Sequence, residues 1–301
     1  MTELNPSMAR TPLPARLLRQ RLLSLLDALP AAASGDVSSV HRARVASRRL
    51  REVLPVLAEA AGSHDLGRAR KDVRRITRAL GPIRELDVAL GHLPEAGRRA
   101  GVSARAVAAV RRHLMGERQI HRRAMLDVIT PSAVARLQAR LADGHAQHPR
   151  ADHEAELLSA RRRAARRAQH LRAEINRAGA LYVSERLHAV RVAAKKVRYA
   201  LEVDRELTRS RALARINRLK ALQDALGDIH DFEILIERIR EVQADLAADD
   251  RQLSSELEAL VRTLETRCRD GHAAFLRDRA AIQEICQRVI DAAREGRPTF
   301  K

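Results

Sequence analysis

The sequence predicts an all-α protein made of two tandem helical bundles, and three observations support this prediction. Ala, Leu, Arg and Glu dominate the 301 residues, and together they favour helix over strand. No segment alternates apolar and polar residues in the way that a half-buried strand requires. The chain also repeats itself at a spacing of about half its length, which indicates two units of similar size.

The repeat is carried by two pairs of segments. Val40–Arg51 (VHRARVASRRLR) aligns without gaps with Leu187–Arg198 (LHAVRVAAKKVR), which lies 147 residues further on. Arg78–Asp87 (RALGPIRELD) aligns with Asp224–Glu233 (DALGDIHDFE), which lies 146 residues further on. Because both pairs occur in the same order, the sequence predicts two tandem units with the same internal organisation.

The first unit, residues 10–145, has the pattern of helices separated by turn signals. Gly81 and Pro82 predict a turn after Leu80, because both residue types disfavour the interior of a helix. Apolar periodicity predicts helices at 14–29, 36–60, 65–80, 83–93 and 103–129, with a shorter piece after Pro131.

The second unit, residues 150–296, follows a polar linker at 144–149. Its expected helices lie at 152–177, 184–206, 210–226, 229–246 and 251–293. The last of these is long, and Gly271 is expected to break or bend it. Helices joined by such short connections pack most naturally as bundles.

The charge balance indicates a polyanionic partner. The chain has 57 Lys and Arg against 38 Asp and Glu, a formal net charge of +19, and a field of this sign concentrates anions. Three Phe, two Tyr and no Trp argue against modules that stack nucleic-acid bases on aromatic rings. No apolar stretch approaches the roughly 20 residues of a membrane span, and Cys268 and Cys286 are too far apart along one helix to bridge. We therefore expect a cytoplasmic protein without a membrane partner.

Two basic stripes are the main candidates for anion binding. At 100° per residue, each repeat segment places its basic side chains on one helix face and its apolar side chains on the adjoining face. Neither stretch contains an acidic residue, although acidic residues at i,i+4 would stabilise a purely structural helix. The alternative is an ordinary solvated face, but the recurrence of unpaired charge at equivalent places favours an exposed anion-binding surface. The stripe residues are His41, Arg44, Arg48 and Arg51 in the first unit and His188, Arg191, Lys195 and Arg198 in the second.

Further basic residues are secondary candidates. Arg49 and Lys196 lie about 80–90° away from the stripes and can reach a different surface. The others belong to the next predicted helix of each unit, and their alternative is a solvated surface position. These residues are Arg74, Arg75 and Arg78 in the first unit and Arg218 and Lys220 in the second.

The two motif histidines are expected to be neutral hydrogen-bonding groups. Each lies near a predicted helix N-terminus, where the helix dipole disfavours an added positive charge. His41 and His188 lack local partners for a metal, and the Arg three residues further on would repel a cation. No phosphate-binding Gly-rich loop, activated nucleophile or acidic cluster for paired metals can be assembled. The sequence therefore predicts no catalytic residue, no metal and no cofactor.

The two histidine-containing basic segments, each followed by a Leu-Gly-x-x-x-[Asp/Glu] segment, resemble CHAD domains, the conserved-histidine α-helical domains. The resemblance covers roughly residues 10–296. It implies two four-helix bundles related by pseudo-twofold symmetry, with a basic groove or pore that binds inorganic polyphosphate. It also implies an association with polyphosphate granules. Some family members are fused to a triphosphatase domain, and no such segment is visible in this sequence.

The sequence therefore leaves three functions open. The first is binding of inorganic polyphosphate by the two motif helices, without enzymatic activity. The second is binding of a nucleic-acid backbone, which needs the same positive charges. The third, which rests on the histidines alone, is a metal-chelating or phosphohydrolase accessory domain. The sequence does not indicate an oligomeric state.

Overall fold

The computed structural model describes residues 13–61, 63–146, 153–208, 213–246 and 250–295. In this part of the chain there are α-helices and no strand, so the all-α prediction is confirmed. The helices are α1 (Leu13–Ser34), α2 (Val37–Ala61), α3 (His64–Ala100), α4 (Ala104–Val128), α5 (Pro131–Ala146), α6 (His153–Ala178), α7 (Ser184–Thr208), α8 (Leu213–Ala244) and α9 (Arg251–Arg294). Within the described residues, no helix has an apolar stretch long enough to cross a bilayer.

The two motif helices are α2 and α7, and local signals place their starts. Gly35 adopts a φ of +98°, which lets the chain reverse between α1 and α2. The carboxylate of Asp36 then accepts a hydrogen bond of 2.7 Å from the backbone N–H of Ser39, which caps the start of α2. Both ends of α7 lie 147 residues after the corresponding ends of α2, the same spacing as the sequence repeat.

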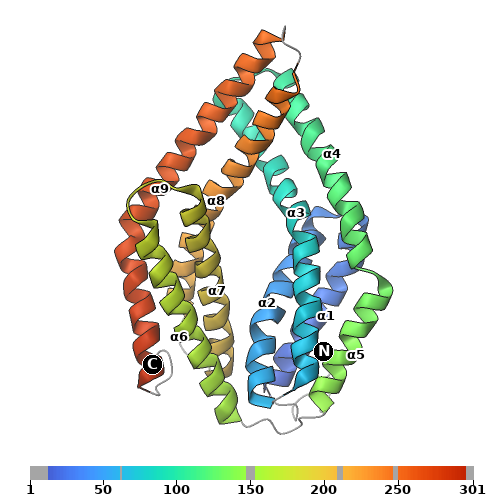
Figure 1. Cartoon of the computed structure of the whole chain (residues 1–301), viewed down its shortest axis with the longest axis vertical. Coiled ribbons are helices and arrows are strands. Elements are labelled where there is room, and N and C mark those ends of the chain that lie inside the picture. The colour runs from blue at the N-terminus through green and yellow to red at the C-terminus, as the bar shows by residue number, and fades with distance from the viewer. Residues whose placement is uncertain (1–12, 62, 147–152, 209–212, 247–249, 296–301) are drawn as a thin grey trace, which may run out of the picture.

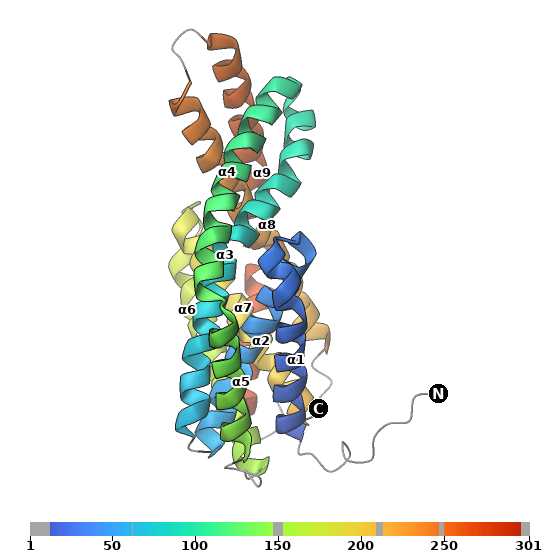
Figure 2. The ribbon, with the colours of Figure 1, turned by 90° about the vertical axis from the view of Figure 1, so that its right-hand side faces the viewer.

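The helices form a long and narrow molecule (Figures 1 and 2). At one end α3 and α4 lean toward α8 and α9 and pack against them, and toward the other end α2 packs against α6 and α7 (Figure 1). Between these two regions of contact, α2 and α3 face α7 and α8 across the middle of the molecule (Figure 1). This arrangement brings the two motif helices together, although they are far apart in the sequence.

Two apolar cores hold the structure together, and four helices, α3, α4, α6 and α7, contribute to both. The first core contains side chains of α1, α2, α5, the end of α4 and the first part of α3 up to Ile83, together with Ala160 of α6 and Val203 and Leu207 of α7. The second core contains side chains of α6–α9, and also the second part of α3 from Leu86 and the first part of α4 up to Leu114. The predicted boundary between 145 and 150 lies largely outside the described residues and stays a prediction, as does the twofold relation between the bundles.

The predicted turn at Gly81 and Pro82 is wrong, because α3 continues through these residues as one helix. The equivalent break predicted near Gly227 is absent as well, since α8 is also continuous. A proline inside a helix removes a backbone hydrogen bond and costs about 3 kcal/mol. Leu80 and Ile83 are fully buried on either side of Pro82, and their packing offsets this cost.

The expected break at Gly271 is also absent, because α9 is helical from end to end. A Cβ atom at Gly271 would lie 2.8 Å from Cγ1 of Ile229 in α8. The glycine therefore allows a close approach of α8 and α9. Cys268 and Cys286 are both buried, free thiols of this helix.

Candidate polyanion-binding cavity

A cavity of about 440 Å³ lies between the motif helices α2 and α7 and the helices that follow them, α3 and α8. Eight arginine or lysine side chains line it, together with His41 and four carboxylates. Basic groups thus outnumber acidic ones twofold in a recess of the surface, where charges are less screened than on an open surface. The basic lining residues are Arg44, Arg48, Arg49, Arg84, Arg191, Lys195, Arg198 and Lys220.

The first arginine of each stripe reaches across to the neighbouring helix. The Nη1 atom of Arg44 donates to the carbonyl oxygen of Thr77 at 3.3 Å, and its Nη2 lies 3.4 Å from Oε1 of Glu85. The equivalent Arg191 lies 3.5 Å from Oδ1 of Asp231. The Arg44–Glu85 pair of the first repeat is thus equivalent to the Arg191–Asp231 pair of the second repeat.

The glycine of each Leu-Gly segment lies beside the corresponding arginine. A Cβ atom at Gly81 would be 2.9 Å from Nη1 of Arg44, so only glycine lets the guanidinium lie directly over α3. At Gly227 the equivalent distance, to Nε of Arg191, is 3.9 Å, an ordinary contact. In the first repeat, Gly81 therefore makes room for the arginine, and in neither repeat does the Leu-Gly segment form a turn.

The expectation that both stripes are exposed is wrong for these two arginines. Only 15% of the Arg44 side chain and 14% of the Arg191 side chain are exposed. Carboxylates on α3 and α8 compensate their charges in part. The two motif segments contain no acidic residue, so these partners could not be inferred from the motif segments alone. Burial, followed by the nearby charge of Arg48, lowers the pKa of Arg44 to about 10.

Lys195 is the most strongly perturbed basic side chain of the cavity. Burial lowers its pKa to about 6, and the charges of Arg191 and Arg48 add to this effect. The lysine is therefore largely neutral at pH 7 when the cavity holds no anion. A bound anion would reverse the balance, because it favours the charged form of the amine.

The motif histidines have different surroundings. His41 lines the cavity directly, and burial followed by the charge of Arg84 lowers its pKa. His188 lies beside the cavity, with its Nδ1 atom 3.2 Å from Nδ1 of His230. Burial, followed by the charge of Arg191, lowers the pKa values of His188 and His230, the latter to about 3. The lowered pKa values of the motif histidines agree with the prediction of neutral imidazoles, but the causes are burial and arginine charges.

Other predicted residues complete the wall of the cavity. Arg198 donates from Nε to Oε1 of Gln223 at 2.9 Å, and its guanidinium lies 4.2 Å from the ring centre of Tyr199. Arg49 is half-exposed and lies 3.6 Å from Oε2 of Glu202. Lys220 reaches the cavity from α8.

A second basic cluster contains predicted residues that do not line the cavity. Burial is the main cause of the lowered pKa of Arg51, and the charge of Arg74 contributes. Burial likewise lowers the pKa of Lys196, with a contribution from Arg167 of α6. We call Arg51, Arg74, Arg167 and Lys196 the second basic cluster; it involves α2, α3, α6 and α7.

Three predicted residues have other positions. Arg75 lines a separate small pocket with residues of α4 and α5. Arg218 faces α9, where its Nη2 atom lies 4.0 Å from Oδ1 of Asp278. Arg78 is exposed on α3 and does not line the cavity.

Several residues that line the basic cavity were not predicted from the sequence. Arg84, Tyr199 and the carboxylates of the cavity were assigned no role in binding. The missed carboxylates are Glu85, Asp224, Asp228 and Asp231. Asp224, Asp228 and Asp231 lie on one face of α8, but only because this helix continues through its Leu-Gly segment. Glu85 lies on α3.

The motif histidines are not part of a cluster of possible metal ligands. Among the described residues, such a cluster is formed by His113, Glu117 and Glu241, on α4 and α8. Arg238 already pairs with both carboxylates, at 2.8 Å from Glu117 and in a close contact with Glu241. This set is therefore an ion-pair network between two helices.

Known structures with the same fold are found. No curated protein matches the chain. The crystal structure of the CHAD domain from the plant Ricinus communis matches with a TM-score of 0.64 and 21% identity, over 87% of this chain and 91% of that one. PptA from Streptomyces chartreusis matches with a TM-score of 0.52 and 15% identity, over 94% of this chain and 98% of that one. A family model for the CHAD domain matches residues 16–240, three quarters of the sequence, and the chain belongs to the CHAD domain family.

Proposed function

We propose that this protein binds inorganic polyphosphate in the cavity between α2, α3, α7 and α8, and that it does so without catalysis. The observation that carries the proposal is the concentration of eight arginine and lysine side chains around one cavity. Guanidinium groups can donate two parallel hydrogen bonds to phosphate oxygens, which suits a chain of repeating phosphates. Association with polyphosphate granules would follow from such binding.

The form of the cavity favours a thin and flexible anion over a nucleic acid. Arg44 and Arg191 are largely buried, so a double helix is too thick to reach them. Single-strand binding usually depends on exposed aromatic rings, but the ring of Tyr199 is buried beneath Arg198.

A competition experiment tests the choice of ligand. Long-chain polyphosphate, duplex DNA and ATP are each used to displace a fluorescent polyphosphate at physiological salt. Polyphosphate should compete far better per molecule than ATP, because only a polymer can occupy many weak sites together. Equal competition by ATP, or stronger competition by DNA, would contradict the proposal.

A matched pair of variants tests the site. In Arg44→Gln/Arg191→Gln, the loss of two buried charged donors should weaken polyphosphate binding by about 30-fold or more. Arg218→Gln removes the same type of charge outside the cavity, next to Asp278, and should bind within about twofold of the wild type. Circular dichroism verifies that both variants are folded. Equal binding by the double variant and the control would exclude the cavity as the site.

A further inference from the structure

The positive charges of the basic cavity continue into the second basic cluster. Arg48 connects the two, because it lines the cavity and its charge acts both on Lys195 in the cavity and on Arg51 in the cluster. Arg44, Arg48 and Arg51 lie on one side of α2 and extend over about 10 Å, at about 1.5 Å per residue. A series of basic side chains therefore leads out of the cavity toward α3 and α6, the helices that contribute the outer part of the cluster.

Two cations of the cluster have no counter-ion. Arg51 and Lys196 are half-buried, and within the described parts of the chain neither has a carboxylate at ion-pair distance. The charge of Glu52 acts on both, but this carboxylate accepts hydrogen bonds of 3.0 and 2.7 Å from Nε and Nη2 of Arg163, and it lies 3.6 Å from Nη2 of Arg167. Half-buried cations lose part of their hydration, so an anion from outside the protein would stabilise them.

The sequence repeat provides an internal comparison for these two cations. At the spacing of 147 residues, their equivalents are Arg198 and Arg49. Glu202 neutralises both equivalents, because its Oε2 lies 3.6 Å from Nε of Arg49 and its Oε1 is in close contact with Nη1 of Arg198. The first unit has Pro55 at the position equivalent to Glu202, so it lacks the matching carboxylate. One pair of cations is thus compensated by the protein, and the other is open to an external anion.

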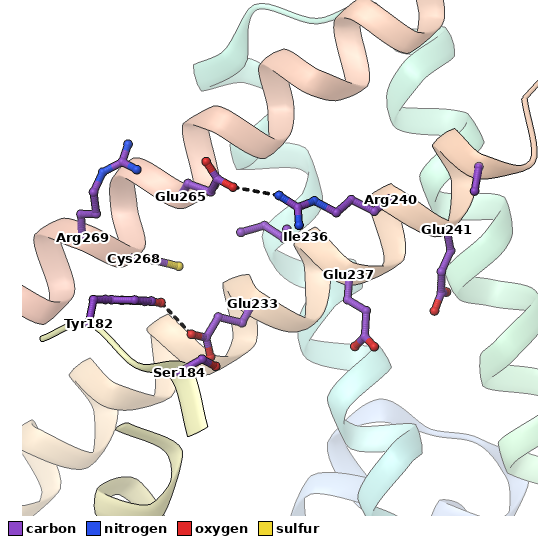
Figure 3. Close-up of a pocket in the computed structure, with 11 residues that line it drawn as sticks. Tyr182, Ser184, Glu233, Ile236, Glu237, Arg240, Glu241, Glu265, Cys268 and Arg269 are labelled. Carbon is purple, nitrogen blue, oxygen red and sulfur yellow. Dashed lines mark hydrogen bonds and ion pairs between the residues drawn. The ribbon is translucent and has the colours of Figure 1, made fainter. Parts of the chain in front are cut away.

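Two other recesses border helices of the cavity, and both are less suitable for an anion. On the side of α1, a pocket of about 340 Å³ shares Arg49 with the cavity, but Glu206 lines this pocket and pairs with its Arg21 in a close contact. Between α8 and α9, a cleft of about 860 Å³ is lined by four glutamates and two arginines (Figure 3). Carboxylates in both recesses repel a phosphate chain. The second basic cluster, by contrast, offers cations without a counter-ion.

Given polyphosphate binding in the cavity, on which this inference rests, we propose that a long chain leaves the cavity over the second basic cluster, and that this cluster makes the protein select long chains. A short chain such as tripolyphosphate is held by the cavity alone. A long chain also reaches Arg51 and Lys196 and, further out, Arg74 and Arg167. Because these added contacts are intramolecular once the chain is bound, they raise the affinity without a second loss of translational freedom.

A salt series with long-chain polyphosphate and the full chain tests this path. In Arg51→Gln/Lys196→Gln the affinity should fall about tenfold, and the slope of log K against log salt concentration should become shallower by about 1.5, because two fewer phosphates release counterions. The variant leaves no carboxylate unpaired and should fold as the wild type does, which circular dichroism verifies. The matched control, Arg16→Gln/Arg19→Gln, removes two exposed charges of α1 outside the cavity lining and the cluster. It should keep the wild-type slope and an affinity within about twofold.

Competition by tripolyphosphate separates the cluster from the cavity. Tripolyphosphate should displace a labelled long chain about tenfold more effectively from Arg51→Gln/Lys196→Gln than from the wild type, because only the long chain loses contacts. Equal weakening of both ligands would show that the cluster acts through the cavity and would overturn the proposal. An affinity and a slope equal to those of the control would overturn it as well, while leaving the cavity as the binding site.

Failure of the proposed function has a different signature. Arg44→Gln/Arg191→Gln would then bind long chains as tightly as the wild type does, and the path that starts in the cavity would fall with it. If the path alone is wrong, this cavity variant still binds long chains weakly, whereas Arg51→Gln/Lys196→Gln behaves like the control.

Discussion

Replacing Lys195 by methionine should make the free protein more stable. In the folded protein, burial and then the charges of Arg191, Arg48 and Arg44 lower the pKa of this amine from 10.5 to about 6, although the Asp231 carboxylate acts in the opposite direction. Since one pKa unit corresponds to 1.36 kcal/mol, holding this amine in the fold costs about 5 kcal/mol at pH 7. Methionine has a similar length, fills the space and removes the cost.

The pH dependence of this effect has a definite sign. Between the two pKa values the unfolded chain binds the proton and the folded protein does not, so wild-type stability rises as the pH rises. The cost is fully present below pH 6 and disappears as the pH passes 10.5. The stability gain of Lys195→Met should therefore be largest at or below pH 6 and should vanish near pH 10.5.

Urea unfolding of both proteins from pH 6 to pH 10 measures the stability difference, and calorimetry with polyphosphate measures the functional consequence. A bound polyanion restores the proton to Lys195, so wild-type binding at pH 7 should take up about one proton more than binding by the variant. Titrations in two buffers of different ionisation enthalpy give this number. A variant that is less stable at pH 7, or one with equal proton uptake, would refute the assignment of a neutral, buried lysine.

Other predictions concern the glycines, the histidines and salt. Gly81→Ala should weaken polyphosphate binding several-fold, because the new Cβ displaces the Arg44 guanidinium, whereas Gly227→Ala should leave binding unchanged and add about 0.5–1 kcal/mol of stability; equal effects at the two sites would contradict this. Glutamine at His41, which lines the cavity, should cost roughly 0.5–1.5 kcal/mol of binding, with no effect of chelators, and a chelator effect reversed by a divalent metal would revive a metal site. Polyphosphate affinity should fall steeply with salt through counterion release, and a salt-independent isotherm would argue against phosphate contacts.

Much of the fold could be predicted because it depends on local patterns. The amphipathic periodicity around Val40–Arg51 and Leu187–Arg198 predicted both motif helices, and the ends of α2 and α7 keep the 147-residue spacing of the repeat. The error at Gly81 and Pro82 has a physical cause, since both residues disfavour a helix locally and tertiary packing overrides this preference. Such packing cannot be inferred from one segment alone.

The lining residues that the sequence predicted lie on the motif helices, except for Lys220 of α8. Residues such as Arg48 and Lys195 were found from their spacing, but the burial of Lys195 depends on which helices surround it. Arg75 and Arg218 were chosen for their charge, and their positions follow from the rotation of α3 and α8, which the sequence leaves open. Arg84 lies in the helix predicted at 83–93 and was given no role; its place in the cavity depends on the continuity of α3 through Gly81 and Pro82.

The continuity of α3 makes the two halves of the molecule inseparable. A fragment that ended after α5 would expose Leu86, Leu93, Val110 and Leu114 to water, because these side chains are covered by the second half of the chain. Each exposure costs about 1.5–3 kcal/mol, and together they would create a sticky surface that promotes aggregation. Melting of either half withdraws side chains from the core of the other. A sequence that consists of two similar units thus forms one cooperative folding unit, and expression of half the chain would not yield half of the protein.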